Sequence, residues 1–328
     1  MRSLTSRSQH LIVGSARASL AVVLLLAASC GSADEGGEAF GEPLSNTVVL
    51  HQDGTDGHVH LAPQEVTARL SVALVPSELV VGPSRFAVGL FDSEGSLVQD
   101  AAVHFHYYDL TDPENAVLES EADAERIVAP DGRTTIFAHD REFNRAGDWG
   151  LEVEARLPGG DAAFQSIGFR VAEDTPSLGP GEVALALETP TLDDVDGDIS
   201  LLTSAESPNP ELHRLSLAEA LANDNPTVLL FATPAFCETR FCGPVYDMVS
   251  EVQPRYADRV NFVYAEAFSG LPDPALAGFQ PSPAMTAFGL ESEPWLFFID
   301  ADGTIRYRLE GLCTVAEIER NLQARLGL

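Results

Sequence analysis

Two cysteines in the last third of the chain have a spacing that suits thiol–disulfide chemistry. Cys237 and Cys242 are separated by Glu-Thr-Arg-Phe. Residues five apart along an ideal helix differ by ~7.5 Å in rise alone, whereas a disulfide needs its Cα atoms within about 7 Å. Pro244 also disfavours a helix through Arg240, because its ring would clash with that carbonyl. We therefore predict a distorted turn between the cysteines, with the regular helix starting near Gly243-Pro244.

The surroundings of the thiols predict different roles for them. Cys237 follows a predicted strand, so we favour it as the nucleophile and Cys242 as the resolving thiol. Helix N-terminal amides and Arg240 stabilise a thiolate, whereas Glu238 opposes it. Cys313 is a third thiol. A third redox partner is one interpretation of it, and a half-buried free thiol at a helix start is the one we favour.

Histidines and acids supply candidates for metal binding. His104 and His106 lie two apart on a predicted strand and share a face; a metal pair is one interpretation, and a solvated strand face is the one we favour. A metal-binding stretch is also one interpretation of three histidines nearer the N-terminus, and polar residues in a disordered linker is the one we favour; they are His51, His58 and His60. The acidic run 193–198 resembles a calcium loop, but Ala205 stands where the bidentate Glu belongs. We predict no metal site and no cofactor.

The elements that position these residues fall into two groups. The first is a series of short β-branched or aromatic runs between turn-forming residues, at 66–75, 86–91, 102–108, 134–138, 149–157 and 164–171. Strands at this spacing favour an antiparallel sandwich of immunoglobulin-like type. The second group alternates strands at 227–233, 260–266, 295–300 and 304–310 with helices at 215–223, 244–256, 284–288 and 315–326. Asp302-Gly303 is a hairpin signal, and the alternation favours an α/β arrangement.

The C-terminal region resembles the thioredoxin superfamily in three features. Phe236-Cys237 follows a core strand, Glu293-Pro294 precedes another, and Gly311 follows the hairpin. The resemblance implies a fold class: an α/β thioredoxin-like C-terminal domain plus an all-β immunoglobulin-like sandwich. The whole layout is similar to extracytoplasmic thioredoxin-like lipoproteins.

The same resemblance implies site residues. It implies a cis bond before Pro294 and a substrate-binding role for Pro294, Glu293 and Phe236 beside the sulfurs. The chain departs from the family in its longer Cys spacing. It also departs at Phe231, which stands where the family has a buried acid. We therefore expect no proton-transfer acid beneath the cysteines.

The first thirty residues have the pattern of an export signal. Arg2, Arg7 and Arg17 precede an apolar run and then Ala27-Ala28-Ser29-Cys30. This resembles a lipoprotein signal, which implies lipidation of Cys30 and anchoring on the extracytoplasmic face of the cell membrane. We predict a signal peptide at 1–30, a flexible acidic tether at 31–65, the sandwich at 66–172, a Pro/Asp-rich linker at 173–210 and the thioredoxin-like domain at 211–328.

Charge narrows the choice of partners. Nineteen Arg oppose fifty acidic residues, which gives a formal net charge of −31. Such a chain repels polyanions, so we expect no nucleic acid partner. We expect its protein clients to be neutral or basic.

Taken together, the residues predict a membrane-anchored thiol–disulfide oxidoreductase. Its partners would be exported protein thiols or disulfides and an upstream redox partner. Two alternatives remain open: an atypical two-cysteine peroxiredoxin-like peroxidase, and a non-enzymatic binding lipoprotein with a structural disulfide. A Sco-type copper chaperone is disfavoured, because the last histidine of the chain, His213, precedes both cysteines.

Overall fold

The computed structural model describes residues 48–52, 59–63, 69–237 and 239–328. The predicted signal peptide and the lipidation site Cys30 lie outside the described residues, as does most of the predicted tether. Two stretches of the tether are described, and they differ from the prediction. Strands β1 (Val48–Gln52) and β2 (Val59–Pro63) pair antiparallel. Their valines and leucines favour extended backbone, which an interpretation based on the acidic residues of this stretch overlooked. No helix in the described parts of the chain is long and apolar enough to cross a membrane.

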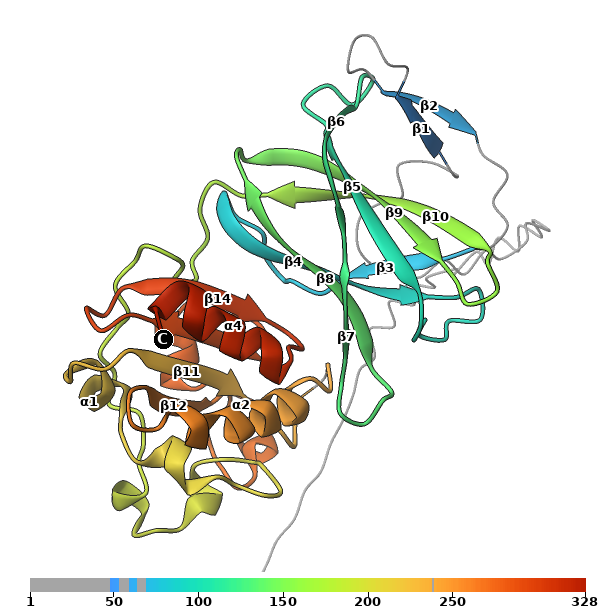
Figure 1. Cartoon of the computed structure of the whole chain (residues 1–328). Helices are drawn as coiled ribbons and strands as arrows, with labels where there is room; N and C mark the ends of the chain where they lie inside the picture. Colours follow the sequence, from blue (N-terminus) through green and yellow to red (C-terminus); the bar gives the residue numbers. More distant parts are fainter. Residues whose placement is uncertain (1–47, 53–58, 64–68, 238) are drawn as a thin grey trace, which may run out of the picture. The chain divides into compact units, whose positions relative to one another are not determined.

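Residues 71–171 form a β-sandwich (Figure 1). One sheet has the order β10-β9-β5-β6 and the other β3-β4-β8-β7, with every neighbouring pair antiparallel. The strands are β3 (Ser71–Leu74), β4 (Gly82–Phe91), β5 (Ala102–Asp109), β6 (Val117–Asp123), β7 (Glu125–Val128), β8 (Thr135–Phe143), β9 (Gly147–Arg156) and β10 (Ala162–Val171). The predicted sandwich is confirmed. β6 and β7 were not predicted from the sequence. The exposed residues of these two strands are mostly acidic, which weakens the sequence pattern of a strand.

Alternation along each strand builds the core of the sandwich. On β5, Phe105 and Tyr107 are fully buried against side chains from the opposite sheet such as Phe86. On β9, Leu151 and Val153 are also fully buried. Since successive residues of a strand point to opposite faces, the residues between these core positions line the outer face of the sheet.

Residues 227–310 contribute a third four-stranded sheet, which is mixed and has the order β12-β11-β13-β14. β11 (Thr227–Ala232) runs parallel to β12 (Asn261–Glu266) and antiparallel to β13 (Trp295–Ile299), which pairs with β14 (Ile305–Glu310). All six residues of β11 are buried, as expected of a central strand covered on both faces.

Helices cover both faces of this sheet. The helices are α1 (Leu217–Leu221), α2 (Cys242–Tyr256), α3 (Pro283–Ala287) and α4 (Val315–Leu326). Val228 and Leu230 of β11 share a core with α2 and α4, whereas Leu229 and Phe231 share one with α1 and α3. Short 3-10 segments occur at Asp193–Val195, Ile199–Leu201, Pro210–His213 and Pro274–Ala277.

The predicted fold class, with its α/β thioredoxin-like component, was wrong. Regular structure among the described residues is mostly β-sheet, in three four-stranded sheets and one two-stranded sheet, and the helices are few. α1 and α3 have five residues each, and the segment 193–213 forms only 3-10 turns. Proline, glycine and acidic residues interrupt the apolar periodicity in these segments, so longer helices do not form there.

Candidate functional site

The two cysteines lie at the junction of a strand and a helix. β11 ends at Ala232, and α2 begins at Cys242. Arg240, between them, has a φ of 64°, a left-handed conformation that is uncommon outside glycine. The amide of Cys242 donates a hydrogen bond to the sulfur of Cys237 over 3.4 Å. The distorted turn is therefore confirmed, although the helix begins one residue earlier than the predicted Gly243.

Cys237 is in a position to react. It is half-buried, and its Sγ lies 3.2 Å from the Thr239 hydroxyl. A hydrogen bond from the Cys242 thiol is the largest cause that lowers the pKa of Cys237, to about 6. The Thr239 hydroxyl and the backbone amides of Phe241 and Cys242 lower the pKa further, against an opposing effect of burial. Cys237 is therefore largely a thiolate at neutral pH.

Cys242 is fully buried and has the opposite electrostatics. Burial raises the pKa of its thiol well above the usual range, and the neighbouring Cys237 raises it further. The two sulfurs and a carboxylate oxygen of Glu293 all lie within 4.8 Å of one another. An exposed thiolate beside a buried thiol is the arrangement of a nucleophile and its resolving partner.

The residues expected to contact a substrate surround this pair. The Glu293–Pro294 bond is cis, as expected, and Pro294 is buried directly before the start of β13. Phe236 is half-buried and packs edge-on against Phe279, which contacts Phe268 in turn. Phe279 is 44% exposed and Leu276 is 87% exposed. The chain beside Cys237 thus presents an apolar surface.

Cys313 does not have the surroundings of a third redox partner. It is fully buried in the apolar cluster that also contains Cys242. Burial raises the pKa of its thiol above the usual range, so the thiolate is suppressed. The structure favours an inert buried thiol, more enclosed than the half-buried position we expected.

Glu266 is a candidate functional residue that the sequence analysis missed. It ends β12 beside the last residue of β11, and it accepts hydrogen bonds from Tyr264 Oη at 2.7 Å and from the amide of Ser204 at 2.9 Å. Its other carboxylate oxygen is buried without a hydrogen-bond partner in the described structure. Burial raises the pKa of this carboxyl.

Thr233 connects Glu266 with the sulfurs. Its backbone amide faces the Cys242 sulfur, and its hydroxyl faces the Glu266 carboxylate closely enough to lower that pKa, although the two oxygens do not form a well-shaped hydrogen bond. The expectation that no acid lies beneath the cysteines considered only the position of Phe231. An acid at the end of the otherwise apolar run 260–266 was the available signal.

The comparisons with known proteins yield weak likenesses only. No protein-family model and no curated protein matches the chain. Solved structures that resemble it include the PmoD soluble domain from Methylocystis sp. ATCC 49242 (Rockwell), which is 12% identical over 33% of this chain and 94% of its own, with a TM-score of 0.23. CopC from Methylosinus trichosporium OB3b is 14% identical over 32% of this chain and 98% of its own, with a TM-score of 0.22.

A third likeness is to the PKD domain of the human VPS10 domain-containing receptor SorCS2. It is 13% identical over 41% of this chain and 97% of its own, with a TM-score of 0.19. TM-scores this low assign neither a family nor a function to the chain.

Proposed function

We propose that this chain is a thiol–disulfide oxidoreductase in which Cys237 attacks and Cys242 resolves. The observation that carries the proposal is the contrast between the two thiols. Cys237 is half-buried with a pKa lowered to about 6, while Cys242, one hydrogen bond away, is fully buried with its pKa raised. A structural disulfide needs no such difference between its two sulfurs.

The exchange proceeds in two displacement steps. The Cys237 thiolate attacks one sulfur of a client disulfide; that S–S bond breaks, a mixed disulfide forms, and the client's other sulfur leaves as a thiolate. Cys242 then loses its proton and attacks Cys237 Sγ, which releases the client's second sulfur. The client has gained two electrons and the Cys237–Cys242 pair has lost two. A dithiol partner resets the pair by the reverse steps.

Glu266 is the candidate acceptor for the Cys242 proton in the second step, and Thr233 lies between the two groups. Cys242 is buried, so its proton needs a nearby acceptor before the sulfur can attack. Glu266 has a buried oxygen without a partner in the described structure and a carboxyl pKa raised by burial, which makes it a better proton acceptor than an ordinary carboxylate. Glu266 therefore acts as a positioned proton-accepting group that does not touch the client.

The client surface and location follow from the same residues and from the sequence. The apolar surface that includes Phe236 and Phe279 suits an unfolded or extended protein segment. Lipidation at Cys30 would place the exchange on the extracytoplasmic face of the membrane, where disulfides persist. The clients would then be exported proteins, and the resetting partner would be a membrane or extracytoplasmic dithiol.

A redox titration of the full chain tests the proposal. The purified chain is equilibrated in glutathione or dithiothreitol buffers, and Cys237 and Cys242 are read by thiol labelling and mass spectrometry, with Cys313→Ser as the matched control. We expect a reversible pair with a potential between about −120 and −270 mV. A bond that stays closed down to about −300 mV would instead indicate a structural disulfide and overturn the proposal.

A further inference from the structure

A second group of chemically competent side chains lies on the outer face of the sandwich. His104 and His106 occupy alternate positions of β5, between the buried core residues of that strand. β6 places Asp123 opposite His104 and Glu121 opposite His106. β9 places Glu154 opposite His104 on the other side. The two imidazoles are therefore enclosed between acidic residues from both neighbouring strands.

Each imidazole has one ring nitrogen that faces an outer carboxylate, at hydrogen-bond distance for His104 and at ion-pair distance for His106. His104 Nδ1 lies 2.7 Å from an oxygen of Asp123, and His106 Nε2 lies 3.8 Å from an oxygen of Glu154. Carboxylates in such positions fix the ring orientation and the tautomer, and they make the other nitrogen a better donor to a metal. The outer carboxylates thus serve as a supporting shell.

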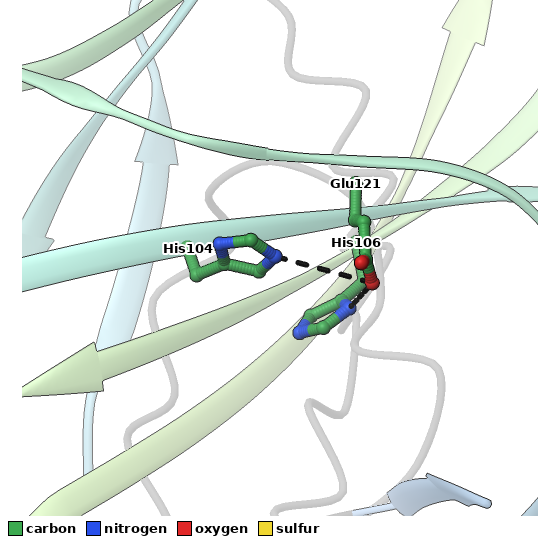
Figure 2. Close-up of side chains that lie close together, drawn as sticks. All are labelled: His104, His106 and Glu121. Carbon is green, nitrogen blue, oxygen red and sulfur yellow. Dashed lines mark ion pairs between the residues drawn. The ribbon is translucent and has the colours of Figure 1, made fainter. Parts of the chain in front are cut away.

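The remaining ring nitrogens converge on a single carboxylate. His104 Nε2 lies 4.0 Å and His106 Nδ1 3.5 Å from the same oxygen of Glu121, as the dashed lines of Figure 2 show. The three donor atoms all lie within 4.8 Å of one another, and the ring centroids are 4.8 Å apart. A shallow pocket of about 460 Å³ opens at the two histidines, so the site is accessible to an ion.

From this convergence we propose that His104, His106 and Glu121 bind one divalent transition-metal ion, of the class of Zn²⁺ or Cu²⁺. Two imidazoles and a carboxylate are a donor set for such ions, whereas Ca²⁺ and Mg²⁺ prefer oxygen alone. Bonds of about 2.1 Å put neighbouring donors about 3.4 Å apart, so the site must contract slightly. The side chain of Glu121 is 59% exposed and free to make that adjustment.

The carboxylates around the two imidazoles favour a cation. Glu152, opposite His106 on β9, is 4% exposed, and one of its oxygens is buried without a hydrogen-bond partner in the described structure. The exposed or half-buried carboxylates of Glu121, Asp123 and Glu154 around the two imidazoles leave negative charge for an ion to neutralise.

Zinc titration of the full-length chain tests the site. The Cys237→Ser/Cys242→Ser background removes competition from the sulfurs, and binding is followed by calorimetry with Zn²⁺. We expect one equivalent to bind, and His104→Gln, His106→Gln and Glu121→Gln each to weaken binding by about 10- to 100-fold. His139→Gln, a half-buried histidine of β8, is the matched control and should leave binding unchanged.

A spectroscopic measurement on the same background does not depend on the folding of any histidine variant. One equivalent of Cu²⁺ should give an electron paramagnetic resonance spectrum with coupling to two imidazole nitrogens. Absence of Zn²⁺ and Cu²⁺ binding would overturn the proposal. Zn²⁺ binding that survives both His106→Gln and Glu121→Gln would overturn it equally, because the ion would then be held elsewhere, for example by the histidines near the N-terminus.

Discussion

The chain contains two sites built from similar donors that differ in access. The sulfur site comprises Cys237, Cys242 and Glu293, and the imidazole site comprises His104, His106 and Glu121. In the sulfur site one donor is fully buried, with its proton held by burial. In the imidazole site all three donors lie on neighbouring strands and retain some exposure. Burial of one donor suits the proposed thiol–disulfide exchange, whereas shared exposure suits the proposed binding of an ion.

Each site is also accompanied by a buried carboxyl group. Glu266 lies beside the sulfur site and Glu152 beside the imidazole site, and each has one buried oxygen without a hydrogen-bond partner in the described structure. Burial raises the pKa of both. Near a buried thiol such a group is suited to accept a proton, and near two imidazoles it adds negative potential.

The largest expected effect separates the two sites by activity. Cys237→Ser should abolish disulfide exchange, by at least about 10³-fold in an insulin-reduction assay, because the nucleophile is lost. The same variant should bind Zn²⁺ with unchanged affinity. Cys313→Ser is the matched control and should retain activity, since that thiol is fully buried. If Cys237→Ser exchanges disulfides at the wild-type rate, Cys237 is not the nucleophile and the proposed sulfur site is wrong.

The next effect concerns Glu152 and the stability of the sandwich. Burial, and then Glu154, raises the pKa of Glu152 from 4.5 to about 7. A raised folded-state pKa contributes stability that is complete below the unfolded value of 4.5 and is lost as pH rises through about 7. The free energy of unfolding of the wild type should therefore fall by about 3 kcal/mol between pH 4 and pH 9. Glu152→Gln should not show this fall.

Chemical denaturation at these two pH values measures that loss. The matched control is Glu142→Gln, which changes an exposed carboxyl of β8. If the free energy of unfolding falls equally in wild type and Glu152→Gln between the two pH values, burial does not raise the pKa of Glu152.

A smaller effect is expected at Glu266. Glu266→Gln should slow the resolution of the mixed disulfide by about 30-fold, less than for direct proton transfer because Thr233 lies between Glu266 and Cys242. Quenched-flow mass spectrometry of the Cys237 adduct measures this step. The dependence on Glu266 should also appear in the pH profile, and Glu266→Asp should restore part of the rate. If Glu266→Gln instead slows the attack of Cys237 on the client disulfide, the substitution has damaged the structure around the sulfurs.

The smallest effect is on the reactivity of Cys237 itself. The side-chain hydrogen bond from Cys242 is the largest cause of the low Cys237 pKa, so Cys242→Ala, which removes that donor, should move the midpoint of alkylation upward from about 6. The rate of alkylation by iodoacetamide at pH 7 should fall by about tenfold. An unchanged midpoint would mean that Thr239 and the amides, and not Cys242, hold the thiolate.

Local signals account for much of what could be predicted. The alternation along residues 102–108 predicted a shared face for His104 and His106, and Phe105 between them is indeed turned into the core. The limit on disulfide geometry correctly required a turn between Cys237 and Cys242. The fold class could not be predicted as well, because the apolar run 215–223 does not reveal that α1 has only five residues, whereas the short helix expected at 284–288 is present as α3.

The sequence by itself determined which residues are available for chemistry and on which face of an element each lies, because side-chain periodicity is a local property. Only the tertiary structure decided which of them meet. Glu121 comes to His104 and His106 through strand pairing, and Glu266 comes to Cys242 through the parallel pairing of β11 and β12. Register and burial depend on contacts between distant segments, and these contacts set the pKa values and donor distances that distinguish a thiolate nucleophile from a buried thiol.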